Sequence, residues 1–482
     1  MKRTIYLLVC TLLSVQLFAQ EKPIQSFSLQ QAVEYAKKYN YILKNNALEV
    51  EAAQKKVNEV MAIGLPNISA TGSFMHNIQI PTQSLPNFLK ESLVGSAMGQ
   101  AEAAYKQQNP GATDQQIQDI RNQTNAIVSK DIPDVIAAQF GQKYSTSASI
   151  TATQLLFDGG FLMGVKASKE YVNVSKINLK RSQVETEVSV SKSYYSVLLI
   201  KTNIELISKN LDLLSKTRFE FEQLSKNGLL DKIEYDRVVL QYSSLELQRD
   251  RLIDQQKILL MVLKLQMGLD VNADIQLTDD LEKMYTESKV ALLSNKVDYN
   301  NRLEYQLVNQ SISLNTLDKK RYQYGYTPSL AAFVTHQQNT FGTSFSQLGN
   351  QWFPGTYWGV NLNVPIFDGL KKNAQIQQSK INIRKAENDK RLLESVITQE
   401  VFSAKTNAER TAQQLDIQKK NFDLSQEIYD RTQLKNKNGI GSSLDLNISQ
   451  RDLETARNSY LTTLYDYFLA QLELKKAMGE IK

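Results

Sequence analysis

The hydrophobic pattern of the chain has two periods, and the same succession of patterns occurs twice. Apolar residues recur every three or four positions over two very long stretches, Phe161–Asn227 and Lys371–Asn438, which is typical of amphipathic helices. Neither stretch contains proline, and the first has no glycine after Gly164. Each can form a helix of roughly 100 Å at about 1.5 Å per residue. No single globular core is that deep, so both helices need helical neighbours.

Shorter helical patterns accompany the long ones. They cover Phe27–Ile63, Ile233–Met267, Asn301–Tyr324 and Leu444–Met478. Ser28 is placed to cap the first of them, and Pro66 and Pro328 follow the first and third. The second and fourth are each about 50 Å long by the same rise. Two short helices stacked end to end would therefore match one long helix.

Four other stretches alternate between apolar and polar residues, as half-buried strands do. They are Asn67–Ile80, Tyr144–Phe157, Ser329–Gln338 and Thr356–Phe367. In the last stretch Trp358 and Leu362 lie on one side and Asn361 and Asn363 on the other. That pattern, at this length, is typical of a tilted strand in a membrane. No stretch after the N-terminal region approaches the ~20 apolar residues that a spanning helix needs, so a membrane crossing would use strands.

Four strands cannot close a membrane barrel. Small barrels need at least about eight strands, and an open sheet edge is not tolerated in lipid. The chain must therefore form an oligomer. Three copies would supply twelve strands and a lumen wide enough for cargo.

Matched landmarks indicate an internal duplication. Phe157 and Phe367 are 210 positions apart, and Gly228 and Gly439, like Gly268 and Gly479, are 211 apart. We divide the chain into a first repeat (21–268), an irregular connector (269–297) and a second repeat (298–482). In each repeat the motif Phe-Asp-Gly joins a strand to a long helix. Asp158 and Asp368 can cap these helices, and Gly159 or Gly369 permits a sharp turn with positive φ.

The first repeat carries an insertion of 52 residues in its strand-to-strand loop, 81–143, compared with the second loop, Asn339–Gly355. The insertion is rich in Gln, Asn and Ala and has helical patterns near Leu89–Gln107 and Asp114–Val128. One interpretation is a surface elaboration. The other is a lid over an outer opening, or a docking surface for an extracellular partner.

The N-terminus is typical of an exported protein. Residues 1–20 have Lys2 and Arg3 followed by an apolar run from Ile5 to Phe18, which predicts a secretory signal peptide. Cys10, the only cysteine, lies inside that run, so the mature chain would have no disulfide. A lipoprotein cysteine at Cys10 is the alternative. The net charge of +6 does not indicate nucleic acid binding.

Motifs for enzyme chemistry are not visible in this sequence. It has no nucleophile elbow, no phosphate-cradling glycine loop and no HExxH, so we expect neither an enzyme nor a cofactor. The two histidines, His76 and His336, would form rings in a trimer, and such rings can bind metal. Their strand context, without a companion His or Cys, favours ordinary sheet positions, and we predict no metal site.

The order of elements resembles the TolC-like outer-membrane efflux proteins. The shared order is a signal peptide, half-helix, Pro, strand pair, Phe-Asp-Gly, long helix, Gly break and half-helix, with everything after the signal peptide repeated. The resemblance covers essentially the whole mature chain. It implies an α+β membrane protein, in which four β-strands per chain complete a trimeric 12-stranded transmembrane β-barrel. A long periplasmic α-helical barrel would continue the duct, and the chain would reside in the outer membrane of a Gram-negative bacterium.

The resemblance also implies partners. The protein would be a homotrimer in outer-membrane lipid, the exit duct of a tripartite efflux pump or a type I secretion system. A periplasmic adaptor (membrane fusion protein) and an inner-membrane transporter of the RND or ABC type would complete the path. Two alternatives are a periplasmic adaptor and a structural coiled-coil protein. Two helix sets interrupted by strand pairs argue against the first, and the alternating strands argue against the second.

The glycine breaks lie at the far ends of the long helices, and the resemblance makes them the periplasmic tip and the adaptor contact. The tip residues are Gly228, Leu229 and Leu230 in the first repeat, and Gly439, Ile440 and Gly441 in the second. Six positions after each glycine break stands an acid, Glu234 or Asp445. By resemblance these acids form carboxylate rings at the pore gate, whereas the residues alone also fit a helix cap or a solvated surface.

The sequence departs from the best-known gate of the family at two positions. Ile448 stands where the second gate acid would fall, and Gly441 stands where the latch arginine would fall. We therefore do not transfer the detailed latch. The sequence does not identify the cargo.

Overall fold

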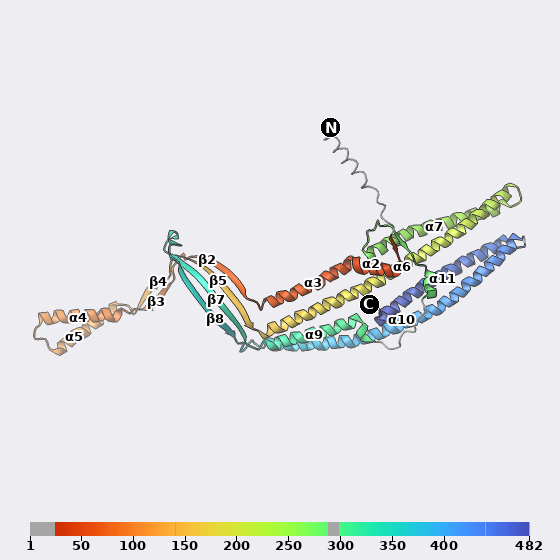
Figure 1. Ribbon diagram of the computed structural model, residues 1–482. Helices are drawn as coiled ribbons and strands as arrows, with labels where there is room; N and C mark the ends of the chain where they lie inside the picture. The colour runs from red at the N-terminus through yellow and green to blue at the C-terminus, as the bar shows by residue number, and fades with distance from the viewer. Residues whose placement is uncertain (1–24, 140, 288–297, 439, 482) are drawn as a thin grey trace, which may run out of the picture. The chain divides into compact units, whose positions relative to one another are not determined.

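A computed structural model describes residues 25–139, 141–287, 298–438 and 440–481 (Figure 1). The predicted signal peptide, Cys10, Gly439 and part of the predicted connector lie outside the described residues. The chain divides into two compact units. The helical unit comprises 25–62, Gly159–Thr327 and 365–481, and the β unit comprises Ile63–Asp158 and Pro328–Val364.

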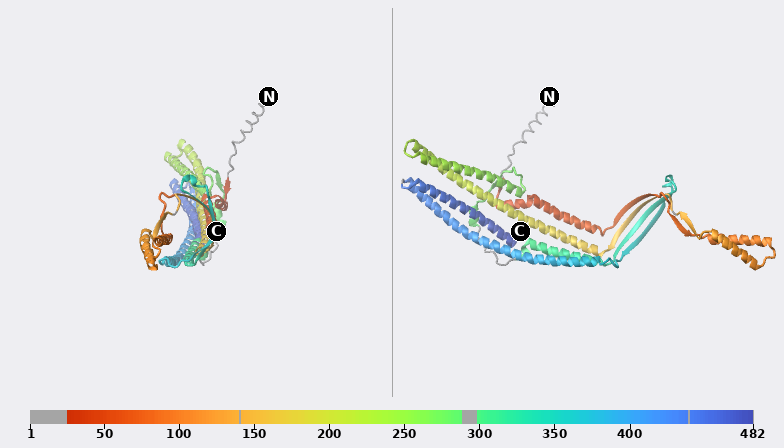
Figure 2. Two further views of the ribbon diagram at one scale, coloured as in Figure 1. Left: turned by 90° about the vertical axis from the view of Figure 1, so that its left-hand side faces the viewer. Right: turned by 180° about the vertical axis from the view of Figure 1, so that it is seen from behind.

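The helical unit is built around two very long helices. Helix α6 (Gly159–Lys226) has 68 residues and α10 (Lys371–Lys437) has 67, so each is about 100 Å long. The 36-residue helices α7 (Lys232–Met267) and α11 (Ser443–Met478) turn back along them. Figures 1 and 2 show α7 beside α6 and α11 beside α10. The observed ends lie within two residues of the ends predicted from sequence.

The remaining half of each long helix is also covered. Helix α3 (Tyr41–Ala62) packs against α6, and α9 (Leu303–Tyr324) packs against both α10 and α6. Each of these helices has 22 residues. Along its length, a long helix is therefore flanked by two shorter ones, as expected from the sequence.

The helix predicted over Phe27–Ile63 is two helices, because Asn40 interrupts it. Helix α2 (Leu29–Tyr39) begins at Ser28, whose side chain and that of Gln31 form a reciprocal capping box. It ends at Asn40, where ψ is 130°. The Asn40 side-chain oxygen then accepts hydrogen bonds from the backbone amides of Ile42 and Leu43, at 2.7 and 3.2 Å. This side chain therefore starts the next helix while the backbone bends.

The predicted connector is more ordered than expected. Strand β6 (Ile275–Leu277) pairs in parallel with β1 (Gln25–Phe27), and α8 (Leu281–Glu287) follows. A short 3-10 turn, η1 (Tyr299–Asn301), precedes α9. Three-residue strands are too short to show a period in sequence, and their pairing partners are far apart along the chain. The prediction of an irregular connector over 269–297 is therefore wrong for β6 and α8.

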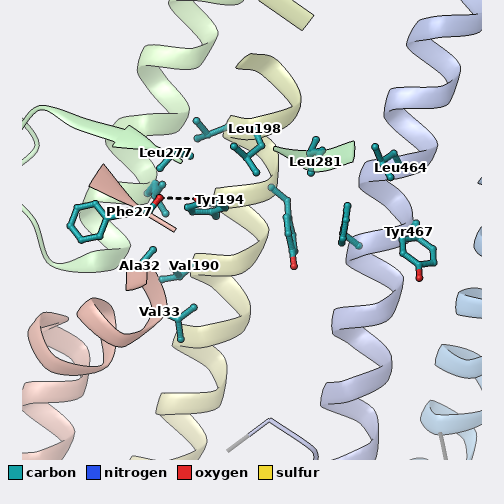
Figure 3. Packing of buried hydrophobic residues seen from close by; sticks show 14 of the residues in the cluster. Phe27, Ala32, Val33, Val190, Tyr194, Leu198, Leu277, Leu281, Leu464 and Tyr467 are labelled. Atoms are coloured by element: carbon teal, nitrogen blue, oxygen red, sulfur yellow. Dashed lines mark hydrogen bonds between the residues drawn. The ribbon is translucent and has the colours of Figure 1, made fainter. Parts of the chain in front are cut away.

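The largest buried cluster lies where β1 and β6 meet the long helices (Figure 3). Tyr194 of α6 is fully buried there, together with Leu281 of α8 and Tyr467 of α11. The Tyr194 hydroxyl lies 2.8 Å from the Phe27 carbonyl oxygen and 3.0 Å from Asp279 Oδ2. Burial, followed by the charge of Asp279, raises the pKa of this hydroxyl. The cluster joins the N-terminal strand, the connector and both helical hairpins in one core.

The β unit is centred on a four-stranded antiparallel sheet. Its strands, in spatial order, are β2 (Asn67–His76), β5 (Tyr144–Phe157), β7 (Ser329–Gly342) and β8 (Phe353–Asn363). A short 3-10 turn, η2 (Phe345–Gln347), lies between the last two. The first and last strands end earlier than predicted, at His76 and Asn363. Beyond Asn363 the nearby Pro365 cannot donate to a ladder.

The two faces of this sheet differ in chemistry, since alternate residues of a strand point to opposite sides. The register pairs odd-numbered residues with odd-numbered residues across the sheet as far as Leu155, where β5 has an irregularity. We call the odd-numbered side the hydroxyl face. Its hydroxyl side chains include Ser69, Thr71, Ser73, Ser145, Ser147, Ser149, Thr151, Thr153 and Thr335. We call the even-numbered side the apolar face; it includes Ile68, Phe74, Ile150, Val334, Trp358, Val360 and Leu362.

The insertion between β2 and β5 forms a helical hairpin on a two-stranded stem. Strands β3 (Thr82–Pro86) and β4 (Val135–Gln139) pair with each other. Helices α4 (Lys90–Gln108) and α5 (Asp114–Asp131) pack together beyond them. The two helices lie close to their predicted positions. The stem strands are not apparent in the sequence, because each has only five residues and one contains Pro86.

Within the described residues, no helix combines the length and the apolar character needed to cross a membrane.

Candidate functional site

The first candidate tip is the turn between α6 and α7. The Gly228 amide donates to the Ser225 carbonyl at 3.1 Å and the Leu229 amide to the Leu224 carbonyl at 2.9 Å. This is the Schellman pattern, which needs a left-handed residue, and Gly228 has φ +72°. The turn leaves Leu229 74% exposed, whereas Leu230 is half-buried.

The second candidate tip joins α10 to α11. The amides of Ile440 and Gly441 both donate to the Lys435 carbonyl, at 3.0 and 3.1 Å. Ile440 is 81% exposed. A Cβ on Gly441 would lie 2.9 Å from the Asn436 amide nitrogen, so this tight turn excludes a side chain. A latch arginine at this position is therefore sterically unsuitable in this chain. Gly439 lies outside the described residues.

The two candidate gate acids stand in the first turns of α7 and α11, but their surroundings differ. Glu234 accepts a hydrogen bond from Arg237 Nη1 at 2.8 Å, one turn along the same helix. Asp445 is exposed and forms no ion pair with any described residue. Ile448 occupies the position that Arg237 holds in the first repeat. The acid of the first repeat is therefore partly neutralised, and the acid of the second is not.

The predicted strand-to-helix junctions also differ from each other. Before α10, the Asp368 carboxylate accepts a hydrogen bond from the Lys372 amide at 3.1 Å. Gly369 has φ +66°, and Leu370 has φ +67°. Gly159, in contrast, is the first residue of α6 and does not have a positive φ; a Cβ there would lie 2.7 Å from Thr327 Oγ1. The first junction therefore requires glycine because of crowding, and Asp158 precedes it.

A groove of about 750 Å³ lies between the two helical hairpins, near the candidate tips. Glu234 and Arg237 line it from α7, and Glu454 and Arg457 line it from α11. Burial raises the pKa of the Glu454 carboxyl. The Nε atom of Arg457 is buried without a hydrogen-bond partner among the described residues. Sequence reasoning missed Glu454 and Arg457, since charged residues on an amphipathic helix are usually solvated and their burial depends on how α11 packs.

Metal binding is not suggested by side-chain clusters in the described part of the chain, where no group of three or more His, Cys, Asp or Glu side chains could hold an ion. His76 stacks on Tyr144, with ring centroids 4.4 Å apart. His336 Nδ1 lies 2.7 Å from Thr356 Oγ1. Both histidines lie on the apolar face of the sheet.

One part of the chain matches a known sequence family. Residues 325–480 match the family described as outer membrane efflux protein. The predicted resemblance to TolC-like efflux proteins is confirmed. No curated protein matches the chain significantly.

Solved structures of outer-membrane proteins and channels share the fold of nearly the whole chain. The open state of the Neisseria gonorrhoeae outer membrane channel MtrE aligns with a TM-score of 0.66 and 15% identity, covering 94% of this chain and 88% of MtrE. The outer membrane protein VceC of Vibrio cholerae aligns with a TM-score of 0.63 and 13% identity, covering 94% of this chain and 96% of VceC. The Campylobacter jejuni outer membrane channel CmeC aligns with a TM-score of 0.63 and 14% identity, covering 94% of this chain and 85% of CmeC.

These comparisons show that residues 325–480 are similar to the outer membrane efflux protein family, and that nearly the whole chain has the fold of solved outer-membrane channels. The MtrE and CmeC proteins that it resembles are outer-membrane channels. At these identities the solved structures establish the fold.

Proposed function

We propose that three copies of this chain form the exit duct of a tripartite efflux pump or a type I secretion system. Each copy contributes four strands to a twelve-stranded barrel in the outer membrane, and the duplicated helices form the periplasmic barrel. The duct conducts substrates passively from a transporter and adaptor complex to the exterior.

The observation that carries this proposal is that the four-stranded sheet is open at both edges and has one apolar face and one hydroxyl face. Its order leaves β2 and β8 each with one unpaired edge within the described residues, and such edges are not tolerated in lipid. On the apolar face Trp358 is 78% exposed, Ile68 72% and Leu362 64%. Pairing β8 of one copy with β2 of the next would close the edges. It would also direct these side chains to lipid and the hydroxyl face to the lumen.

We propose that the two turns at the ends of the long helices meet the periplasmic adaptor. Leu229 and Ile440 are apolar and highly exposed there, and exposed apolar side chains at a rigid turn are suited to contact another protein. The homotrimer would offer six such turns around its axis. The inner-membrane transporter, of the RND or ABC type, engages the duct with this adaptor.

We propose Asp445 as the main gate carboxylate. In a trimer an inward carboxylate becomes a ring, which attracts cations at a constriction. The Arg237 partner of Glu234 reduces the field that Glu234 can exert. Asp445→Asn should therefore weaken cation selectivity in planar bilayers more than Glu234→Gln does. Equal effects of the two substitutions would contradict this assignment.

The deciding experiment for the proposed function combines particle mass and conductance. The purified protein should be a trimer that dissociates on heating, and it should conduct ions in a planar bilayer once its periplasmic tip is opened. A monomeric particle, or an opened trimer that remains electrically silent, would exclude an exit duct. Crosslinking in cells should attach Leu229 and Ile440 to the adaptor.

The helical hairpin of the insertion is proposed to be either a lid or a surface elaboration of the duct. Its stem closes where the Asn87 amide donates to the Asp134 carbonyl, at 2.9 Å, so residues 88–133 can be replaced by a short turn. A lid predicts a higher conductance in this deletion variant, whereas a surface elaboration predicts an unchanged conductance.

A further inference from the structure

We propose that the hydroxyl face of the four-stranded sheet is a wall without fixed charge, which passes polar solutes regardless of the sign of their charge. Charge selection is then left to the helical ends of the duct. This inference rests on the proposed function, in which the hydroxyl face lines the lumen. It goes beyond that function by assigning a specificity to each part of the path.

Charged side chains are absent from all four strands of this sheet. Strands β2, β5, β7 and β8 contain no Asp, Glu, Lys or Arg, although these residues make up 22% of the chain. Charge resumes next to the sheet, at Lys143 before β5 and at Asp158 after it. The uncharged stretch therefore coincides with the strands themselves.

Hydroxyl pairs bridge neighbouring strands on this face. The side-chain oxygens of Thr71 and Ser149 are 2.7 Å apart, as are those of Ser73 and Ser147. Thr151 and Thr335 continue the series at 3.0 Å. A hydroxyl both donates and accepts hydrogen bonds, so this wall can solvate a cation, an anion or a neutral polar group.

The histidine side chains of the strands do not add charge to the hydroxyl face either. His76, Tyr144 and His336 all lie on the apolar face, by the register of the sheet. On the hydroxyl face Tyr357 packs edge-to-face against Phe333, with ring centroids 6.2 Å apart. Phe333 lies over Gly359, where a Cβ would be only 2.9 Å from its ring. The aromatic contribution to this face is therefore an uncharged, packed patch.

A wall of this kind generates little electrostatic potential. Rings of fixed charge, multiplied by threefold symmetry, are what make a pore selective for one sign. The helical tips carry such charge at Asp445, and the sheet carries none. The substrate class that fits the β section is therefore any polar solute small enough to enter, and the sign of its charge does not matter within this section.

Single cysteines with charged thiol reagents can test this inference. In a Cys10→Ser background the chain has no other cysteine. Ser147→Cys and Ser149→Cys place a thiol on the hydroxyl face, and the adjacent Ala148→Cys places one on the apolar face. A cationic and an anionic methanethiosulfonate of similar size are applied to intact cells. The reaction rate of the cationic reagent is divided by that of the anionic reagent, and this ratio is normalised to the same ratio for a free thiol in solution. The normalised ratio reports the sign of the local potential.

We expect both hydroxyl-face cysteines to react, with a normalised rate ratio within roughly threefold of one, and Ala148→Cys to be protected by lipid. Adding Ser73→Asp opposite Ser147→Cys should shift the ratio roughly tenfold toward the cationic reagent, whereas adding Ser73→Asn should not. These two additions show that the assay detects a carboxylate on this wall.

Two results would overturn the inference in different ways. A ratio far from one at Ser147→Cys and Ser149→Cys, with Ala148→Cys still protected, would leave the duct intact and exclude a neutral wall. Equal reaction of Ala148→Cys and Ser147→Cys would show that the faces are not divided between lipid and lumen. The proposed function would then fail, and the inference with it.

Discussion

The two predicted repeats contain similar joints that are built with different side chains. Helices α7 and α11 both end at a left-handed glycine, Gly268 with φ +77° and Gly479 with φ +71°. Gly268 lies against the backbone just before α3, and Gly479 lies against the backbone just before α9. A Cβ at Gly268 would be 2.5 Å from the Tyr39 carbonyl oxygen, and one at Gly479 would be 2.8 Å from that of Asn301.

The side chains that cap these joints are not related. Asn40 Nδ2 donates to the Gln266 carbonyl at 2.6 Å, and Arg302 Nη1 donates to the Ala477 carbonyl at 2.9 Å. Both acceptors lie two residues before the glycine. Arg302 also contacts Glu400 Oε2 at 2.9 Å and Glu304 Oε2 at 3.2 Å. At both joints the glycine backbone lies close to a neighbouring backbone segment, and a side-chain hydrogen-bond donor lies beside it. The donor is an amide in the first joint and a guanidinium in the second, so its chemistry is not what the two joints share.

The largest effect should come from Gly268→Ala. An alanine there combines a left-handed backbone with overlap against backbone atoms of Tyr39 and Asn40, which together should destabilise the fold by about 3–5 kcal/mol. Thermal unfolding followed by circular dichroism measures this loss. Gly479→Ala should behave similarly if the two joints are equivalent.

Gly228→Ala is the matched control for this comparison. Its φ of +72° is almost the same, but no atom lies within 4 Å of the added Cβ. The strain alone should cost about 1–2 kcal/mol. If Gly228→Ala and Gly268→Ala lose equal stability, close approach is not what the joint requires.

Arg302→Ala should have the next largest effect. The guanidinium is buried, and its removal leaves the Ala477 carbonyl and Glu400 without this donor. The free energy of unfolding should fall by about 2–3 kcal/mol. Chemical denaturation of Arg302→Ala, Glu400→Ala and the double variant gives the coupling between the two residues. A coupling near zero would mean that the carbonyl contact alone explains the loss.

Asn40→Ala should destabilise the first joint by about 1–2 kcal/mol, because one side chain both caps α3 and donates to Gln266. Asn40→Asp keeps the accepting oxygen and loses the donor. If the aspartate variant is as stable as the native chain, the donor to Gln266 contributes nothing, and the parallel with Arg302 fails.

The smallest effect concerns Glu454, which stands where the first repeat has Ser243 at the offset of 211. Burial raises the pKa of Glu454 above its ordinary value of 4.5. The folded state therefore favours the neutral carboxyl, and this stabilisation is complete below pH 4.5 and lost as the pH rises through the folded pKa. Glu454→Gln should raise the melting temperature at pH 8 and leave it unchanged at pH 4. A gain of the same size at both pH values would exclude this origin.

Sequence could predict the long elements because their periods persist over many turns. The paired state of Glu234 is also readable, since Arg237 follows three residues later, whereas Ile448 follows Asp445. The pairing of β1 with β6 was not predictable, because three residues show no period and Gln25 meets Ile275 only in the fold. The break at Asn40 was missed because no proline or glycine marks it. The half-buried Glu454 depends on helix packing, which a helical period does not specify.

The uninterrupted α6 has a mechanical consequence. Between Val165 and Lys226 it contains neither proline nor glycine, the residues at which helices usually bend. A rod without a hinge acts as a lever, so a twist applied by a partner at the Leu229 turn is carried roughly 90 Å along the axis with little loss.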